Sequence, residues 1–130
     1  MTVQITAIYA ALLGLLLVIL SVRVVGVRRS RRVSLGDGGD ADLRGRIRAH
    51  ANFTEYTPMA LLLMAFAESL GAAGLIVHGL GLALTAGRIA HAVAISPVRQ
   101  NLLLRTIGMS LTFAVLIVGS ACVLILIFAR

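Results

Sequence analysis

Long stretches without charge are the feature that most constrains the fold of this chain. Residues 1–22, 69–87 and 106–129 contain no Asp, Glu, Lys or Arg. About 20 helical residues, each rising 1.5 Å, cross the hydrocarbon layer of a membrane. Residues 56–67 form a fourth apolar stretch, which reaches that length if its helix begins near Leu43. Because a spanning segment must satisfy its own backbone hydrogen bonds, the sequence predicts four transmembrane helices.

The composition agrees with a membrane protein. Of 130 residues, 59% are hydrophobic and 13% are charged, about half the charged fraction of a globular protein. The mean hydropathy is +1.00. We therefore predict an all-α integral membrane protein, with a single four-transmembrane-helix bundle over residues 1–130. The expected helices cover about 3–30, 42–69, 72–95 and 100–128.

The net charge of +7 comes entirely from arginine, because all 12 basic residues are Arg. A basic chain often binds nucleic acid, but these arginines cluster between the apolar stretches, mainly at 23–32 and 44–48. Membrane topology and anionic lipid headgroups explain that distribution better, so we expect no nucleic-acid partner. The positive-inside rule then places the arginine-rich loops in the cytoplasm and both termini outside.

A polar stripe leads into the second span. Arg48, Asn52, Glu55 and Tyr56 are spaced at i, i+4, i+7 and i+8, so a helix presents them on one face. Ionisable side chains in a membrane helix are costly and often functional. One interpretation is an interfacial cap, in which Arg48 reaches lipid headgroups and Glu55 joins a structural ion pair. The other is a polar ligand site that faces the neighbouring helices.

The third span carries a second pair of polar side chains. Arg88 lies about two turns from the cytoplasmic end of that span, and His91 follows one turn later. An arginine that faces lipid costs roughly 2.5–3.5 kcal/mol on insertion scales. Arg88 is therefore expected to face the protein interior, where Glu55 is its natural counter-charge.

Residue chemistry alone leaves several ligands open. We expect no metal site, because the chain has one cysteine and three scattered histidines. No catalytic triad or nucleotide-binding fingerprint is spaced convincingly. Several arginines suit a small ligand with carboxylates, and Glu55 suits an ammonium group. Glutathione fits this description, with a thiol that an arginine can stabilise as the thiolate, as one candidate among many.

Three motifs resemble the MAPEG family (membrane-associated proteins in eicosanoid and glutathione metabolism). R-A-H-A-N-F-T-E-Y-T-P at 48–58 resembles the signature of the family. G-R-I-A-H-A-V-A at 87–94 is similar to the corresponding helix of the family's prostaglandin E synthase. V-R-R-S-R-R-V-S at 27–34 resembles the end of the first helix in its leukotriene C synthase. The resemblance covers essentially the whole chain. It implies four-helix protomers in a homotrimer, with glutathione bound between protomers near the cytoplasmic face.

The resemblance also implies a set of site residues. Arg48 would hold a glutathione carboxylate, while Glu55 and Tyr56 would hold its γ-glutamyl end. The positions that match the family's glutathione-binding residues, or line the same site, are Arg28, Arg48, Asn52, Glu55, Tyr56, Arg88 and His91.

The catalytic position departs from the family pattern. The eicosanoid enzymes place a thiolate-stabilising arginine just after the third helix, flanked by tyrosines. Residues 95–99 of this chain read I-S-P-V-R, which is shorter and lacks the tyrosines. Arg99 is therefore the first candidate for a catalytic, thiolate-stabilising residue and Arg29 the second.

Three functions compete at this stage. The first is a glutathione transferase or peroxidase that acts on lipophilic small molecules entering from the bilayer. The second is a non-catalytic lipid-binding or scaffold member of the same family. The third, a small multidrug transporter, needs an acidic residue in the first helix for proton coupling, and residues 1–22 contain none.

Overall fold

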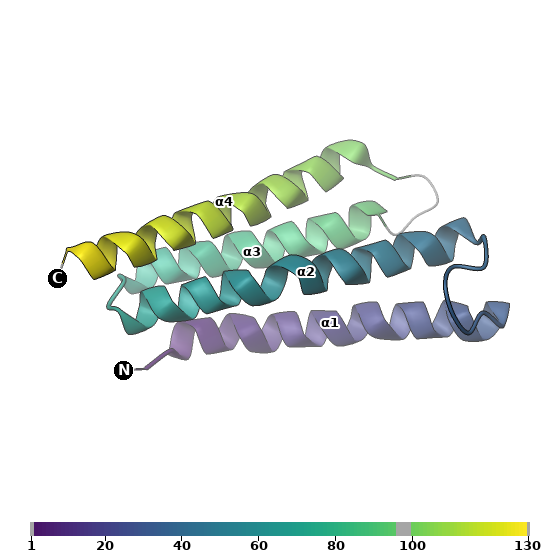
Figure 1. The fold of residues 1–130 in the computed structure, drawn as a ribbon, viewed down its shortest axis with the longest axis horizontal. Coiled ribbons are helices and arrows are strands. Elements are labelled where there is room, and N and C mark those ends of the chain that lie inside the picture. Colours follow the sequence, from purple (N-terminus) through teal and green to yellow (C-terminus); the bar gives the residue numbers. More distant parts are fainter. Residues whose placement is uncertain (1, 96–99, 130) are drawn as a thin grey trace.

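Four long α-helices make up the protein, which we describe from a computed structural model covering residues 2–95 and 100–129. The helices lie alongside one another in a single bundle (Figure 1), and the described residues include no strand. The all-α, four-helix fold predicted from the sequence is therefore confirmed. The helix bounds are Gln4–Arg31 for α1, Ala41–Ser69 for α2, Gly74–Ile95 for α3 and Leu102–Phe128 for α4.

Three of the described helices, α1, α3 and α4, are long and apolar enough to cross a membrane. Helix α2 has 29 residues, so at 1.5 Å per residue it is also long enough to cross. Its first half, however, carries the polar stripe and several arginines, which lower its hydropathy. The bundle thus combines three apolar helices with one helix whose first half is polar.

Large apolar side chains cover the outside of the bundle. Leu15, Leu82 and Ile117 are 65%, 63% and 70% exposed, respectively. Soluble monomers rarely expose so many contiguous apolar side chains. Together with the apolar helices, this surface identifies an integral membrane protein.

Helices α3 and α4 approach each other closely at two glycines. A Cβ atom added to Gly108 would lie 2.7 Å from the carbonyl oxygen of Gly87. Small residues permit such backbone contact between membrane helices. The contact also brings the next residues in sequence, Arg88 and Met109, against each other.

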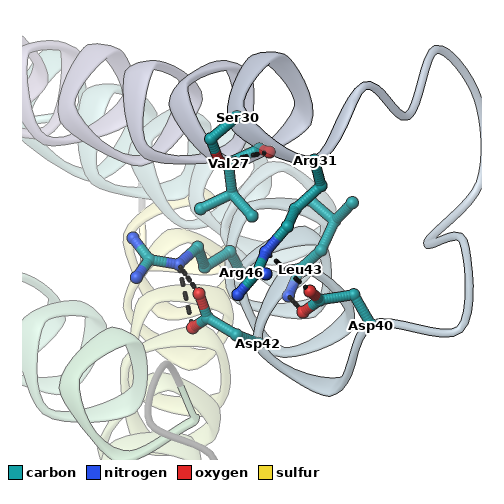
Figure 2. A network of polar contacts seen from close by, with 7 residues as sticks. All are labelled: Val27, Ser30, Arg31, Asp40, Asp42, Leu43 and Arg46. Carbon is teal, nitrogen blue, oxygen red and sulfur yellow. Dashed lines mark hydrogen bonds and ion pairs between the residues drawn. The ribbon is translucent and has the colours of Figure 1, made fainter.

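The connection between α1 and α2 is held by charged side chains (Figure 2). Asp40 caps α2 by accepting a hydrogen bond from the backbone N–H of Leu43 at 2.9 Å. Arg31 pairs with Asp40 at 3.1 Å, and Arg46 pairs with Asp42 one turn earlier at 3.0 Å. We predicted from the sequence that this helix begins near residue 42. Asp40 is its capping residue, because the Asp40 side chain reaches the first turn.

The opposite end of the bundle fastens the start of α1 to the end of α2. The carboxylate of Glu68 accepts hydrogen bonds from the backbone N–H groups of Ile5 at 2.9 Å and Thr6 at 2.8 Å. These N–H groups lie in the first turn of a helix, where no intrahelical partner exists. The residue before α1, Val3, provides no side-chain cap. Glu68 therefore caps α1 from a neighbouring helix.

The polar residues of interest gather at one end of the bundle. The end of α1, the start of α2 and the start of α4 lie together, opposite the start of α1 and the end of α4 (Figure 1). This up-and-down arrangement brings arginines that are far apart in the sequence to the same level. Which end faces the cytoplasm stays a prediction from the positive-inside rule.

Candidate functional site

A buried arginine is the centre of the candidate site. Arg88 on α3 is 1% exposed, so the expectation that it faces the protein interior is confirmed. Its Nη1 donates to the side-chain oxygen of Asn52 at 2.7 Å, and its Nη2 donates to the sulfur of Met109 at 3.4 Å. Its Nε is buried and has no partner among the described residues. A full positive charge is thus held by neutral acceptors.

The expected ion pair between Arg88 and Glu55 is wrong for the described part of the chain. Glu55 is exposed, and no ion pair joins it to another described residue. Residue 55 lies about 60° around the helix axis from Asn52, since each residue advances 100°. Asn52 is the member of the polar stripe that faces α3, so its amide takes the place of the expected carboxylate.

His91 lies one turn beyond Arg88 and is 2% exposed. Arg48 on α2 and Arg105 on α4 are both within electrostatic reach of its ring. Of these three arginines, Arg88 is buried, Arg105 is half-buried and Arg48 is exposed. Such a concentration of positive charge favours an anionic ligand.

Arg105 is a member of this cluster that the sequence reasoning did not assign. The sequence feature that indicates its position is the four-residue spacing of Arg105, Met109 and Phe113, which places them on one face of α4. That periodicity is visible in the sequence, but its partners on other helices are not.

Tyr56 borders a groove on the surface of α4. Its ring packs edge-on against Phe113, with a centroid distance of 5.6 Å. The groove has a volume of about 340 Å³. Two of its lining residues contact predicted site residues, because Met109 accepts from Arg88 and Phe113 packs on Tyr56. The lining consists of Leu102, Arg105, Thr106, Met109, Ser110 and Phe113.

A second groove, of about 440 Å³, lies between the end of α1 and the start of α2. It contains Arg28, Arg44 and Arg48 beside Asp37. Arg44 donates a hydrogen bond to Asp37, and this contact holds the pKa of the Asp37 carboxyl below its ordinary value. Arg28 and Arg48 form no ion pair among the described residues, and Nη1 of Arg28 is buried without a partner. The groove therefore has unmatched hydrogen-bond donors for an anion.

Of the two candidate catalytic arginines, the structure describes Arg29, which lines neither of these grooves. Arg29 is exposed and lines a neighbouring groove on the outer side of α1. Arg99 lies outside the residues that the structure describes. His50, part of the R-A-H-A-N motif, instead ties α2 to α1, with its Nε2 atom 3.1 Å from the hydroxyl of Ser21.

The predicted binding residues thus fall into three groups. Asn52 and Arg88 are buried together between α2 and α3, and His91 is buried where α3 packs on Gly108 of α4. Tyr56 lies beside the α4 groove, and Glu55 is on the surface. Arg28 and Arg48 share the groove between α1 and α2.

Comparison with known proteins places these features in a family context. The sequence profile of the MAPEG family matches residues 6–125, a range that includes every described residue of the candidate site. The inner membrane protein YecN of Escherichia coli strain K12 is 46% identical over 88 residues, which are 68% of this chain and 67% of that protein. YecN of Escherichia coli O6:H1 gives the same values.

Proposed function

This chain belongs to the MAPEG family, and on that premise we propose that it is a membrane-embedded glutathione-binding protein. The proposed activity is that of a glutathione transferase or peroxidase acting on lipophilic electrophiles from the bilayer. The fold and the family support a membrane location. Glutathione as the ligand is the step that we add.

The observation that carries the proposal is the buried guanidinium of Arg88 without a carboxylate partner among the described residues. A buried charge needs a counter-charge or several hydrogen bonds. Glutathione has two carboxylates, an ammonium group and a thiol. The unpartnered donors of Arg28 and Arg88 suit its carboxylates. The exposed carboxylate of Glu55 suits its ammonium group.

In this proposal the residues of the site bind glutathione, orient it and favour ionisation of its thiol. When bound, glutathione would supply a nucleophilic thiol for reaction with a lipophilic electrophile. Arg28 and Arg48 would orient the molecule through its carboxylates, since their guanidinium groups form paired hydrogen bonds. A cation beside the sulfur lowers the pKa of a thiol and favours the thiolate. Arg99 and Arg29 are the candidates from the sequence, and Arg105 joins them because it lines the α4 groove.

The assembly belongs to the same proposal. We propose the homotrimer of the family, with the site completed by neighbouring protomers and the arginine-rich loops in the cytoplasm. The exposed apolar faces of the helices would contact the partner protomers and the membrane lipids. The exposed Glu55 would then face a neighbouring protomer rather than Arg88 of its own chain.

A non-catalytic lipid-binding or scaffold protein is the second candidate. It is favoured by the enclosure of Arg88, which is 1% exposed and covered on the α4 side by Met109. In that case the charge would serve the packing of three helices rather than a ligand.

A titration of the purified protein in detergent separates the two candidates. Glutathione binding is measured by calorimetry, thiolate formation by ultraviolet absorbance, and turnover with an aryl halide. We expect binding, a thiolate signal and conjugation. Arg48→Gln should weaken binding, whereas Arg46→Gln should not, because Arg46 lies outside the grooves and pairs with Asp42. Absence of glutathione binding by the native protein would sink the proposal.

Loss of turnover with binding retained identifies the thiolate-stabilising residue. Arg99→Ala, Arg29→Ala and Arg105→Ala are compared for this purpose. If none of the three changes turnover, none of these three arginines activates the thiol.

A further inference from the structure

The acidic residues of the α1–α2 connection are all engaged by arginines. Asp37 accepts from Arg44, and the two ion pairs drawn in Figure 2 engage Asp40 and Asp42. The arginines on the outer side of α1, Arg29 and Arg32, form no ion pair among the described residues. Two arginines without an acidic partner among the described residues therefore lie close together at the end of α1.

These arginines line a groove of about 370 Å³ at the end of α1. Its lining residues include three arginines and one serine. Nη1 of Arg28 is buried and has no partner among the described residues. The set of donors suits a phosphate group, which accepts several charge-assisted hydrogen bonds. The lining residues are Val25, Arg28, Arg29, Arg32, Val33 and Ser34.

The backbone shapes this groove by turning back at Arg32. The N–H of Val33 donates to the carbonyl of Arg28 at 3.0 Å, and the N–H of Arg32 donates to that of Arg29 at 3.3 Å. This is a Schellman helix end, in which the residue with positive φ is usually glycine. Here it is Arg32, with φ 57°. Glycine would relieve the strain of this conformation, so the arginine contributes a side chain at a conformational cost.

An apolar stripe on α1 leads to the groove. Leu15, Val18, Val22 and Val25 are 65%, 58%, 63% and 44% exposed. Their spacing of three or four residues places them on one helix face, and Arg29 continues the same face. The stripe spans about 15 Å at 1.5 Å per residue. The basic groove thus lies at the end of an apolar stripe that can face the bilayer.

We propose that this surface binds an anionic phospholipid from the bilayer. The phosphate would occupy the groove of Arg28, Arg29 and Arg32, and an acyl chain would lie along the apolar stripe. Juxtamembrane arginines attract anionic headgroups, and the stripe distinguishes a lipid from a free anion. The inference is separate from glutathione binding, although Arg28 borders both grooves.

The test uses the purified full-length protein in a neutral detergent. Its melting temperature is followed while phosphatidylglycerol, phosphatidylcholine with the same acyl chains, glycerol phosphate or inorganic phosphate is added. We expect stabilisation by phosphatidylglycerol alone, because it combines net negative charge with acyl chains. Equal stabilisation by phosphatidylcholine would remove the role of charge. Equal stabilisation by glycerol phosphate or inorganic phosphate would show a free-anion site. Either result overturns the proposal.

Two variants with the same loss of charge make the test specific. Arg32→Gly should keep the melting temperature of the lipid-free protein, because glycine accepts the positive φ. It should weaken phosphatidylglycerol binding about fivefold, the contribution of one surface arginine. Arg31→Gln is the control, since Arg31 faces Asp40 outside the groove. Equal weakening by both variants would point to general charge attraction and overturn a site in the groove.

Glutathione binding is measured on the same Arg32→Gly protein. We expect it to be unchanged, because Arg32 is outside the groove that holds Arg28 and Arg48. Loss of phosphatidylglycerol binding with glutathione binding intact supports the lipid site. Phosphatidylglycerol stabilisation that persists in Arg32→Gly at full strength rejects it, whatever the protein does with glutathione.

Discussion

Replacing Asn52 by leucine tests whether its amide holds the buried charge of Arg88. The side-chain oxygen of Asn52 accepts from Nη1 of Arg88 at 2.7 Å, and Arg88 is 1% exposed. A hydrogen bond to a charged group contributes about 1.5–3 kcal/mol, and breaking a buried charged pair costs about 3–5 kcal/mol. The guanidinium of Arg88 retains Met109 and the Asn52 carbonyl as weaker acceptors at 3.4 Å. We therefore expect Asn52→Leu to lower the free energy of unfolding by about 2–4 kcal/mol.

The double variant Asn52→Leu with Arg88→Met should recover most of that loss. It removes both polar groups and fills their space with apolar side chains, a change that is often nearly neutral for buried pairs. Asn52→Asp should instead raise stability, because a carboxylate would then face the guanidinium at the position of the amide oxygen. The pattern of a costly single change and a mild double change is the signature of a coupled pair.

Unfolding is followed by circular dichroism in detergent, with heat or denaturant. A loss below about 0.5 kcal/mol for Asn52→Leu, the size of an ordinary surface substitution, would refute the dependence of Arg88 on Asn52. A double variant as unstable as Asn52→Leu alone would refute the coupling. If the folded double variant also fails to bind glutathione, the charge serves the ligand rather than the fold.

Further predictions concern the two ends of the bundle and its closest helix contact. Glu68→Ala should lower the free energy of unfolding by about 1–3 kcal/mol, because two backbone N–H groups of α1 lose a charged acceptor. Hydrogen exchange should become faster in the first turn of α1 alone, and unchanged exchange there would contradict the prediction. Asp37 has a lowered pKa, mainly because Arg44 donates to it, so its stabilisation is present above its unfolded pKa of about 4 and is lost as pH falls through the folded value. Asp37→Asn should reduce this acid sensitivity in unfolding curves measured between neutral and acidic pH, and identical curves would contradict the effect. Gly108→Ala should lower the free energy of unfolding by about 1–3 kcal/mol, because the added Cβ would lie 2.7 Å from the Gly87 carbonyl oxygen. An unchanged melting temperature would show that α3 and α4 separate easily.

Several features of the protein follow from local sequence patterns. The charge-free stretches predict helices because only a helix of bilayer length satisfies its backbone in lipid. The spacing of Arg48, Asn52, Glu55 and Tyr56 predicts a shared helix face, since helical periodicity is a property of neighbouring residues. The insertion cost of an arginine predicts that Arg88 turns inward. These inferences need no knowledge of how the helices pack.

The partner of Arg88 depends on tertiary packing. Glu55 and Asn52 lie on one stripe less than a full turn apart, and either could face α3. The packing of α2 against α3 orients Asn52 inward and leaves Glu55 exposed. The expectation based on charge named the wrong residue. Opposite charges make a pairing favourable, but the way the helices cross determines which side chain faces the partner helix.

The contribution of α4 also depends on packing between distant parts of the chain. Arg105, Met109 and Phe113 have a visible spacing, yet their contacts lie on α2 and α3. The backbone contact of Gly87 with Gly108 sets the register of α3 against α4 and so places Met109 on Arg88. Periodicity within a helix defines its faces, whereas the match between faces of different helices is set by close packing over the whole bundle.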